Sequence, residues 1–213
     1  MKDDRDEIII DGEIVNGTFS TRAPKIRMNP VRLLFWDATL FFVFKIFLFL
    51  FVIGSLIFVF WTKILGGIFL AIGLLAAVCI WRYVSLRKME FKNAVLAPGI
   101  VTAQNPPTVL ILTNMACGDA EAPVWAVELK DCRSLSPFSA EIGTRIPCVT
   151  AFLGSGIGGS WDKMVSNPLT SGTGDRKLLD EALARLDDED EWRILIEAVD
   201  KKKFPQLGKT LRI

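Results

Sequence analysis

The glycine-rich segment 154–160 has a glycine pattern that is known from nucleotide-binding loops. Three of its glycines have the spacing GxGxxG and are Gly154, Gly156 and Gly159. In dinucleotide sites such glycines let the backbone approach a pyrophosphate, which is held by a helix that opens on the last glycine. Here the stretch 160–165 runs into Asn167-Pro168 and is too short for that helix. We therefore predict a connecting loop, and contact with a nucleotide or another anion is the alternative.

Trp161 and Asp162 follow this loop directly. An exposed tryptophan is a frequent anchor of protein–protein contacts, whereas most tryptophans of a small domain lie at least partly in its core. The sequence leaves both positions open for Trp161. The candidate interaction surface consists of Trp161, Asp162, Gly154, Gly156 and Gly159, and its partner would be another protein or a second copy of the chain.

The composition argues against the common catalytic centres. The chain has no histidine, which excludes Ser-His-Asp and Cys-His catalysis and histidine-bound metals. The cysteines are Cys79, Cys117, Cys132 and Cys148. They form no CxxC pair, so we expect neither a zinc site nor disulfides.

The acidic run 187–191 is typical of a solvated helix start, and a cation site or a basic partner is its alternative. The net charge of +1 gives no footprint for nucleic acid. We expect no enzymatic activity, metal or cofactor.

An apolar block, residues 33–81, lies within a hairpin segment assigned to residues 33–92 and is expected to anchor the soluble part of the chain. Its two uncharged runs are residues 46–61 and 64–81. About 20 apolar residues suffice to cross a bilayer, and the first run becomes long enough if the Lys45 side chain reaches the headgroups. We predict a transmembrane hairpin of two helices, at about 34–61 and 64–83, joined by a short turn. A re-entrant hairpin that does not cross the bilayer is the alternative.

Positive charge orients this hairpin. Basic residues stand on both flanks of the block, whereas the turn carries only Lys63. Because positive flanks stay on the cytoplasmic side, both termini are expected in the cytoplasm and the turn outside. Tryptophan rings favour the bilayer surface, and basic side chains suit anionic headgroups. The predicted membrane-interface residues are Arg27, Arg32, Trp36, Trp61, Lys63, Trp81, Arg82, Arg87 and Lys88.

Small residues on the second apolar helix predict close packing. Gly66, Gly73 and Ala77 fall on one helical face, and small faces let helices approach closely. The neighbour is either the first helix or another protomer. Polar residues inside the block are sparse, which gives a solute pathway little support.

The flanking segments predict an α+β protein. Residues 1–32 form a cytoplasmic segment with a short β-hairpin around Asp11-Gly12 and an extended linker in which Pro30 breaks helix. Residues 93–213 form a cytoplasmic domain. The predicted strands there are 108–113, 124–129 and 145–153, and the predicted helices are 176–186, capped by Asp175, and 189–202. A turn at Pro98-Gly99, a loop at 166–174 and a frayed tail complete it. The predicted fold is a two-helix transmembrane hairpin plus a β-rich domain, either a small barrel or a twisted sheet, with two C-terminal helices.

Several segments of the domain resemble a known family. They are APGIV at 97–101, PVWAVEL at 123–129, GTRIPCVTAF at 143–152 and Trp161-Asp162. Residues 94–200 resemble a bacterial membrane-associated family of unknown function. The resemblance implies a location in a bacterial inner membrane. It brings no activity and therefore no catalytic residue.

These observations favour a membrane-anchored, non-enzymatic protein whose cytoplasmic domain mediates protein interaction or assembly, as an accessory or scaffold subunit. One alternative is a nucleotide- or anion-binding enzyme that uses the 154–160 loop. Another is a small pore or transporter subunit built by oligomerisation of the hairpin.

Overall fold

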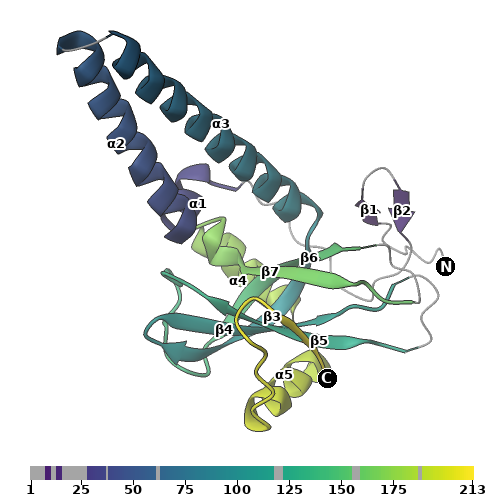
Figure 1. Ribbon diagram of the computed structural model, residues 1–213. Coiled ribbons are helices and arrows are strands. Elements are labelled where there is room, and N and C mark those ends of the chain that lie inside the picture. The colour runs from purple at the N-terminus through teal and green to yellow at the C-terminus, as the bar shows by residue number, and fades with distance from the viewer. Residues whose placement is uncertain are drawn as a thin grey trace. The chain divides into compact units, whose positions relative to one another are not determined.

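The structure is a computed structural model and describes residues 8–10, 13–15, 28–36, 38–60, 63–117, 122–154, 159–186 and 189–213. The chain divides into two compact units. The helical unit comprises residues 29–89, and the β-rich unit comprises residues 1–28 and 90–213. Figure 1 follows the elements along the chain.

The helical unit begins with a short helix that the sequence did not predict. Its helices are α1 (Pro30–Trp36), α2 (Ala38–Phe60) and α3 (Lys63–Asn93), of which the last continues into the β-rich unit. The side-chain oxygen of Asn29 accepts hydrogen bonds from the backbone N–H groups of Val31 and Arg32, at 3.0 and 3.3 Å. Asn29 is thus an N-cap, and Pro30 takes the first helical position, where no N–H is needed. The prediction that Pro30 breaks helix was wrong for this reason.

Glycines bring α2 and α3 close together near their connection. A Cβ atom on Gly66 would collide with the backbone of Phe58, and one on Gly54 would lie 2.8 Å from Cβ of Phe69. Further from the connection, a Cβ on Gly73 would lie 3.9 Å from the nearest atoms of α2. Packing of the small face against the first helix is therefore confirmed at Gly66, and the space between the helices widens away from the turn.

The outer surface of α2 and α3 is apolar. Phe60 and Ile64, on either side of the connection, are 81% and 82% exposed, and many other large apolar side chains of both helices are exposed as well. Residues 40–60 and 63–89 are each long and apolar enough to cross a membrane. The protein thus has the two candidate membrane-spanning helices that the sequence predicts.

The β-rich unit is built on one antiparallel sheet of six strands, in the order β7-β6-β3-β4-β5-β8. The strands are β3 (Val95–Gln104), β4 (Pro107–Asn114), β5 (Trp125–Asp131), β6 (Arg145–Leu153), β7 (Lys163–Pro168) and β8 (Thr210–Arg212). β1 (Ile8–Ile10) and β2 (Glu13–Val15) form the predicted hairpin as a separate two-stranded sheet. The large sheet is strongly twisted (Figure 1). The predicted α+β class, with a twisted sheet and a C-terminal helical pair, is confirmed.

Three segments predicted to be irregular are strands. Pro98-Gly99 lies inside β3, where Pro98 is opposite Pro147 of β6. β3 pairs with β4 only from Gly99 onward, so the missing N–H of Pro98 removes no bond to β4. The other two segments are β7, which includes part of the expected 166–174 loop, and β8, in the expected frayed tail. Both are edge strands: β7 pairs with β6, and β8 pairs with β5. This pairing makes them strands although their own sequences have only a weak preference for strand structure.

Two helices pack on this sheet and match the two predicted ones closely. They are α4 (Arg176–Arg185) and α5 (Glu189–Asp200), and a short 3₁₀ turn, η1 (Leu169–Ser171), precedes them. Leu179 of α4 and Leu195 of α5 are fully buried. The Arg145 guanidinium lies over the ring of Trp192 in α5, 4.7 Å from the ring centroid. The indole N–H of Trp192 donates a hydrogen bond to the Leu186 carbonyl at 2.6 Å.

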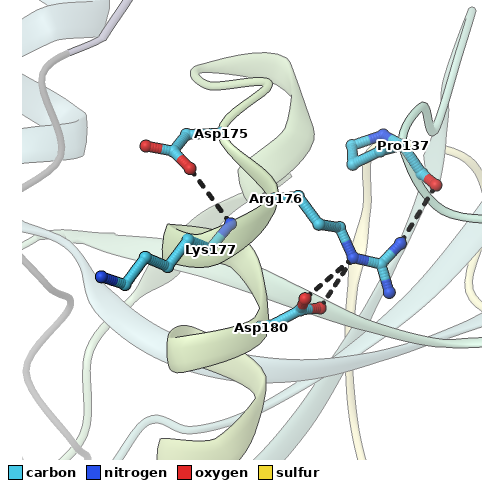
Figure 2. Close-up of polar contacts among 5 residues, drawn as sticks. All are labelled: Pro137, Asp175, Arg176, Lys177 and Asp180. Carbon is cyan, nitrogen blue, oxygen red and sulfur yellow. Dashed lines mark hydrogen bonds and ion pairs between the residues drawn. The ribbon is translucent and has the colours of Figure 1, made fainter.

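The start of α4 is fixed by polar contacts (Figure 2). The Asp175 carboxylate accepts a hydrogen bond from the backbone N–H of Lys177 at 3.0 Å, which confirms Asp175 as the N-cap. Arg176 binds both oxygens of Asp180, at 2.9 and 3.0 Å, and donates to the Pro137 carbonyl at 3.2 Å. The last bond links α4 to the turn before β6.

Loss of this cap should weaken α4 measurably. We expect Asp175→Ala to lower the free energy of unfolding by about 1 kcal/mol, because an N–H of the first turn loses its acceptor. Asp175→Asn keeps an acceptor and should stay close to wild type. Urea denaturation of the full chain in detergent, followed by circular dichroism, measures both. Equal losses in the two variants would contradict a capping role.

Candidate functional site: the glycine turn and the polar core of the sheet

The glycine segment connects two neighbouring antiparallel strands. β6 ends with Leu153 opposite Lys163, the first residue of β7. Beyond the turn, Ser160 forms an isolated bridge with Ala116, and the Cys117 N–H donates to the Gly159 carbonyl at 3.0 Å. The chain thus leaves the turn along the end of β4 and enters a strand. A strand in this place does not supply the helix N-terminus that a dinucleotide site requires.

The backbone conformation explains why two positions of this segment, 154 and 159, are glycine. Gly154 has a φ of +122°, and a Cβ there would collide with the Asp162 side chain. Gly159 has a φ of +78°. Residues other than glycine rarely adopt such values. Gly156 lies outside the described residues. Asp162 and Gly154 are exposed, and Gly159 is half-buried.

Trp161 is buried, so its indole does not provide the exposed contact that the sequence left open as one of two positions. Its side chain is 4% exposed and stacks on Phe152, with ring centroids 5.8 Å apart and planes 11° apart. The backbone N–H of Trp161 donates to the Met115 carbonyl at 2.9 Å, and the backbone carbonyl of Trp161 accepts from Arg212 at 3.1 Å. The indole therefore belongs to the core, the alternative that the sequence left open. Leu153 supplies exposed apolar surface beside the turn instead, with 50% exposure.

A buried carboxylate joins strands that are not neighbours in the sheet. Glu128 of β5 is 3% exposed and accepts a hydrogen bond from the backbone N–H of Ser166 in β7, at 2.8 Å. The hydroxyl groups of Ser166 and Thr150 lie 2.9 Å apart and are both fully buried. β7 and β5 occupy the first and fifth places of the sheet, so their approach requires the sheet to curl. Glu128 therefore helps to close the sheet on itself.

The sequence did not identify this cluster, and its signal was misleading. Glu128 is the one polar residue of the segment 124–129, and a charged side chain in a strand with one solvated face is expected on that face. In the structure, Ala126, Val127 and Glu128 are all buried. Curling of the sheet brings β7 close to β5, and only this long-range contact, made by the Glu128 side chain, reveals why Glu128 is buried.

Burial makes the cysteines of the β-rich unit poor nucleophiles. It raises the pKa of the Cys132 thiol from its usual 9.0 to about 12, with a smaller lowering by Lys130 and a small rise due to Asp131. It raises the pKa of Cys148 well above 9.0, and Cys132 and Glu128 nearby add to the rise. Burial and the Asp162 carboxylate also raise the pKa of Cys117. Since the thiolate is the reactive form, these positions favour packing.

We expect at most one thiol of the folded protein to be alkylated rapidly by iodoacetamide at mildly alkaline pH, namely the exposed Cys79 of α3. Because folding raises the pKa of Cys132 from 9.0, the protonated thiol stabilises the fold fully below pH 9, and this contribution is lost as the pH rises toward 12. Mass spectrometry of the labelled chain, with and without denaturant, tests the expectation. Rapid labelling of Cys132 or Cys148 in the folded chain would contradict it.

The acidic run lies at the start of α5. Asp190 forms an ion pair with Arg193 one turn later, at 2.8 Å, on the helix surface. Asp187 and Asp188 lie outside the described residues. Within the described parts of the chain, no group of three or more His, Cys, Asp or Glu side chains could hold a metal ion.

Of the predicted membrane-interface residues, two lie on α1, Lys63 begins α3, and the others that the structure describes lie in the second half of α3. Lys63, Trp81, Arg82 and Lys88 are exposed, and Arg32, Trp36 and Arg87 are half-buried. Arg27 and Trp61 lie outside the described residues. Arg87 is oriented by Tyr83: its Nε and Nη2 atoms donate to the tyrosine hydroxyl at 3.1 and 3.0 Å, and its guanidinium lies 5.1 Å from the ring centroid.

Comparisons with known proteins agree with the resemblance predicted from the sequence. A search of curated proteins finds no match. Among solved structures, the chain is similar to the crystal structure of a proposed membrane protein from Corynebacterium diphtheriae, with 21% identity and a TM-score of 0.46; the match covers 55% of this chain and 99% of that one. The family described as "Protein of unknown function (DUF3239)" matches residues 82–203. Because this match spans more than half of the chain, the protein belongs to that family, whose function is not known.

Proposed function

We propose that the protein is a two-pass membrane protein whose helical hairpin holds the β-rich unit at the cytoplasmic face, where this unit binds a protein partner or further copies of the chain. In this proposal the protein acts as an accessory or scaffold subunit and catalyses no reaction. A bacterial inner membrane is the expected location.

The exposed apolar surface of α2 and α3 is the observation that carries the proposal. Each square ångström of apolar surface in water costs about 25 cal/mol, and side chains such as Phe60 and Ile64 are almost entirely exposed. A bilayer removes this cost, and the helices satisfy their own backbone groups within lipid. The basic residues on both flanks favour a cytoplasmic position for both ends.

The chemistry of the β-rich unit supports a binding role. Cys117, Cys132 and Cys148 are held in the unreactive thiol form by burial. The buried carboxylate of Glu128 accepts a structural hydrogen bond. The glycine segment connects β6 to β7. None of these groups combines a nucleophile with a base in the way that covalent catalysis requires.

Exposed apolar side chains suggest where a partner binds. In the β-rich unit, Phe204, Leu207 and Leu211 are 42%, 56% and 39% exposed and lie in or just before β8. β8 is an edge strand of three residues, and such an edge can accept a further strand. We name Phe204, Leu207 and Leu211 the C-terminal edge. It is the first candidate surface, and Asp162 with the glycine turn is the second.

A pull-down from lipid nanodiscs, with the mass and stoichiometry of the complex measured, tests this proposal. We expect Phe204→Ser with Leu207→Ser to release the partner or to reduce the oligomer. Ile142→Ser is the matched control, because Ile142 is 66% exposed and lies in the turn before β6. A monomer with no specific companion in wild type would contradict the binding role. Release by Asp162→Lys alone would move the surface to the glycine turn.

A further inference from the structure

An apolar groove opens between α2 and α3 at the end away from their connection. The two helices touch at Gly66 and diverge from there (Figure 1). The resulting cavity has a volume of about 200 Å³, is partly open, and is lined by Leu40 and Val43 of α2 and by Cys79, Ile80 and Tyr83 of α3. Pockets for whole drug-sized ligands measure about 300–1,000 Å³. This groove is therefore suited to a segment of a narrow apolar chain.

A guanidinium stands at one end of this groove. Tyr83 lines the groove with its ring, and its hydroxyl accepts two hydrogen bonds from Arg87, one helical turn further along α3. The arginine is thus fixed relative to the groove by the same side chain that lines it. An oriented guanidinium is the preferred protein group for binding a phosphate oxygen pair.

The depth of these residues matches the boundary of a membrane leaflet. With a rise of about 1.5 Å per residue, Arg87 lies about 36 Å along α3 from Lys63. The hydrocarbon core of a bilayer is about 30 Å thick, and the headgroups extend it to about 40–45 Å. If Lys63 marks one hydrocarbon boundary, Tyr83 lies at the other, and Arg87 reaches the phosphate layer.

Charge at this end of the helical unit favours an anionic ligand. Near this end the sequence has more basic than acidic residues. The basic residues are Arg32, Arg82, Arg87 and Lys88, and the acidic residues are Asp37 and Glu90. A zwitterionic lipid offers the same phosphate together with a cation that this surface repels. An anionic phospholipid offers the phosphate alone.

We propose that the groove binds one acyl chain of an anionic phospholipid of the cytoplasmic leaflet, with the lipid phosphate on Arg87 and with Tyr83 as the residue that positions Arg87. The inference rests on the proposed membrane anchoring. The lipid fills the space that the diverging helices leave and fixes their separation at the membrane surface.

Native mass spectrometry of the full chain tests the proposal. The protein is taken into detergent from vesicles of phosphatidylcholine that contain phosphatidylglycerol, and the retained lipid is identified. Wild type should retain a single phosphatidylglycerol, about tenfold in preference to phosphatidylcholine, as expected for one charge-assisted contact. Arg87→Gln should abolish the preference, and Tyr83→Phe should weaken it.

Two matched controls separate the groove from general surface charge. Arg82→Gln removes the same charge from an exposed position near Arg87 and should leave retention within about twofold, because exposed charges interact weakly. Cys79→Phe fills the groove and should release the lipid. Val78→Phe adds the same bulk at a neighbouring position outside the lining, 57% exposed, and should not.

Equal effects of Arg87→Gln and Arg82→Gln, or retention unchanged by Cys79→Phe, would overturn the proposal. A lipid-free dimer whose formation Cys79→Phe prevents would assign the groove to a second copy and would also overturn it. The proposed anchoring fails separately, if alkaline carbonate extracts the wild-type chain from the vesicles.

Discussion

Replacing Gly99 by alanine is expected to lower the free energy of unfolding of the β-rich unit by about 3 kcal/mol, the upper end of the usual cost of overpacking a core. Gly99 lies in β3, between β6 and β4. A Cβ there would lie 2.5 Å from the Cys148 Sγ atom, 2.9 Å from Cγ1 of Val109 and 3.2 Å from the Ile146 carbonyl oxygen. Cys148 and Val109 are fully buried, so neither has solvent-filled space to move into. Urea denaturation in detergent, followed by tryptophan fluorescence, measures the loss.

A double-mutant cycle assigns the cause of this loss. Cys148→Ala removes the closest atom, so Gly99→Ala should cost about 1 kcal/mol less in that background than in wild type. Ala97→Gly is the contrasting change: it removes a methyl group from the residue that pairs with Cys148 in the sheet, whereas Gly99→Ala adds one. If Gly99→Ala costs the same with and without the Cys148 sulfur, the contact with that sulfur does not explain the need for glycine.

Removing the acceptor at Glu128 should have the second large effect. We expect Glu128→Leu to lower the free energy of unfolding by about 1–3 kcal/mol, the cost of leaving a buried donor without a partner. The donor is the backbone N–H of Ser166, 2.8 Å from the carboxylate. Leucine has a similar size and no acceptor, so the substitution removes this hydrogen bond with little change in side-chain volume. Hydrogen exchange of β7, read by mass spectrometry in the full chain, should rise together with the loss of stability.

Glu128→Gln is the matched control for this bond. Its amide oxygen can accept from the same N–H, so the variant should stay within about 0.5 kcal/mol of wild type, the usual range of a change that breaks no buried contact. Faster exchange of β7 in both variants would mean that the negative charge, and not the acceptor, holds β7 near β5. If β7 exchanges at the wild-type rate in Glu128→Leu, the Glu128 side chain does not hold the curled sheet closed.

Local signals in the sequence were sufficient for much of the fold. The long uncharged runs predicted α2 and α3, because lipid-facing helices need only length and apolarity. β6 was predicted with its observed bounds, Arg145–Leu153, from an apolar run with β-branched residues. α4 was found from its leucine spacing and from Asp175, a cap that acts on its own first turn. In each case the signal lies within the sequence of the element itself.

Long-range interactions explain what the sequence did not reveal. β7 has a polar sequence and becomes a strand because β6 pairs with it and Glu128 binds it. Pro98 is tolerated in β3 because β4 pairs with this strand only from Gly99 onward. Trp161 is buried because Phe152 and Arg212, distant in the sequence or across the turn, hold its ring and backbone. Such contacts form only after the sheet has assembled, so no window of the sequence carries them.

Substituted-cysteine labelling tests the proposed membrane topology of the chain. In a Cys79→Ala background, the remaining cysteines are buried, and one new cysteine is added at a time. Thr62→Cys probes the connection between α2 and α3, and Ser139→Cys probes an exposed loop of the β-rich unit. A membrane-impermeant maleimide applied to intact bacterial cells should label Thr62→Cys at once and Ser139→Cys only after the membrane is permeabilised. Labelling of Ser139→Cys in intact cells, or of Thr62→Cys only after permeabilisation, would contradict a hairpin that crosses the membrane and keeps the β-rich unit in the cytoplasm.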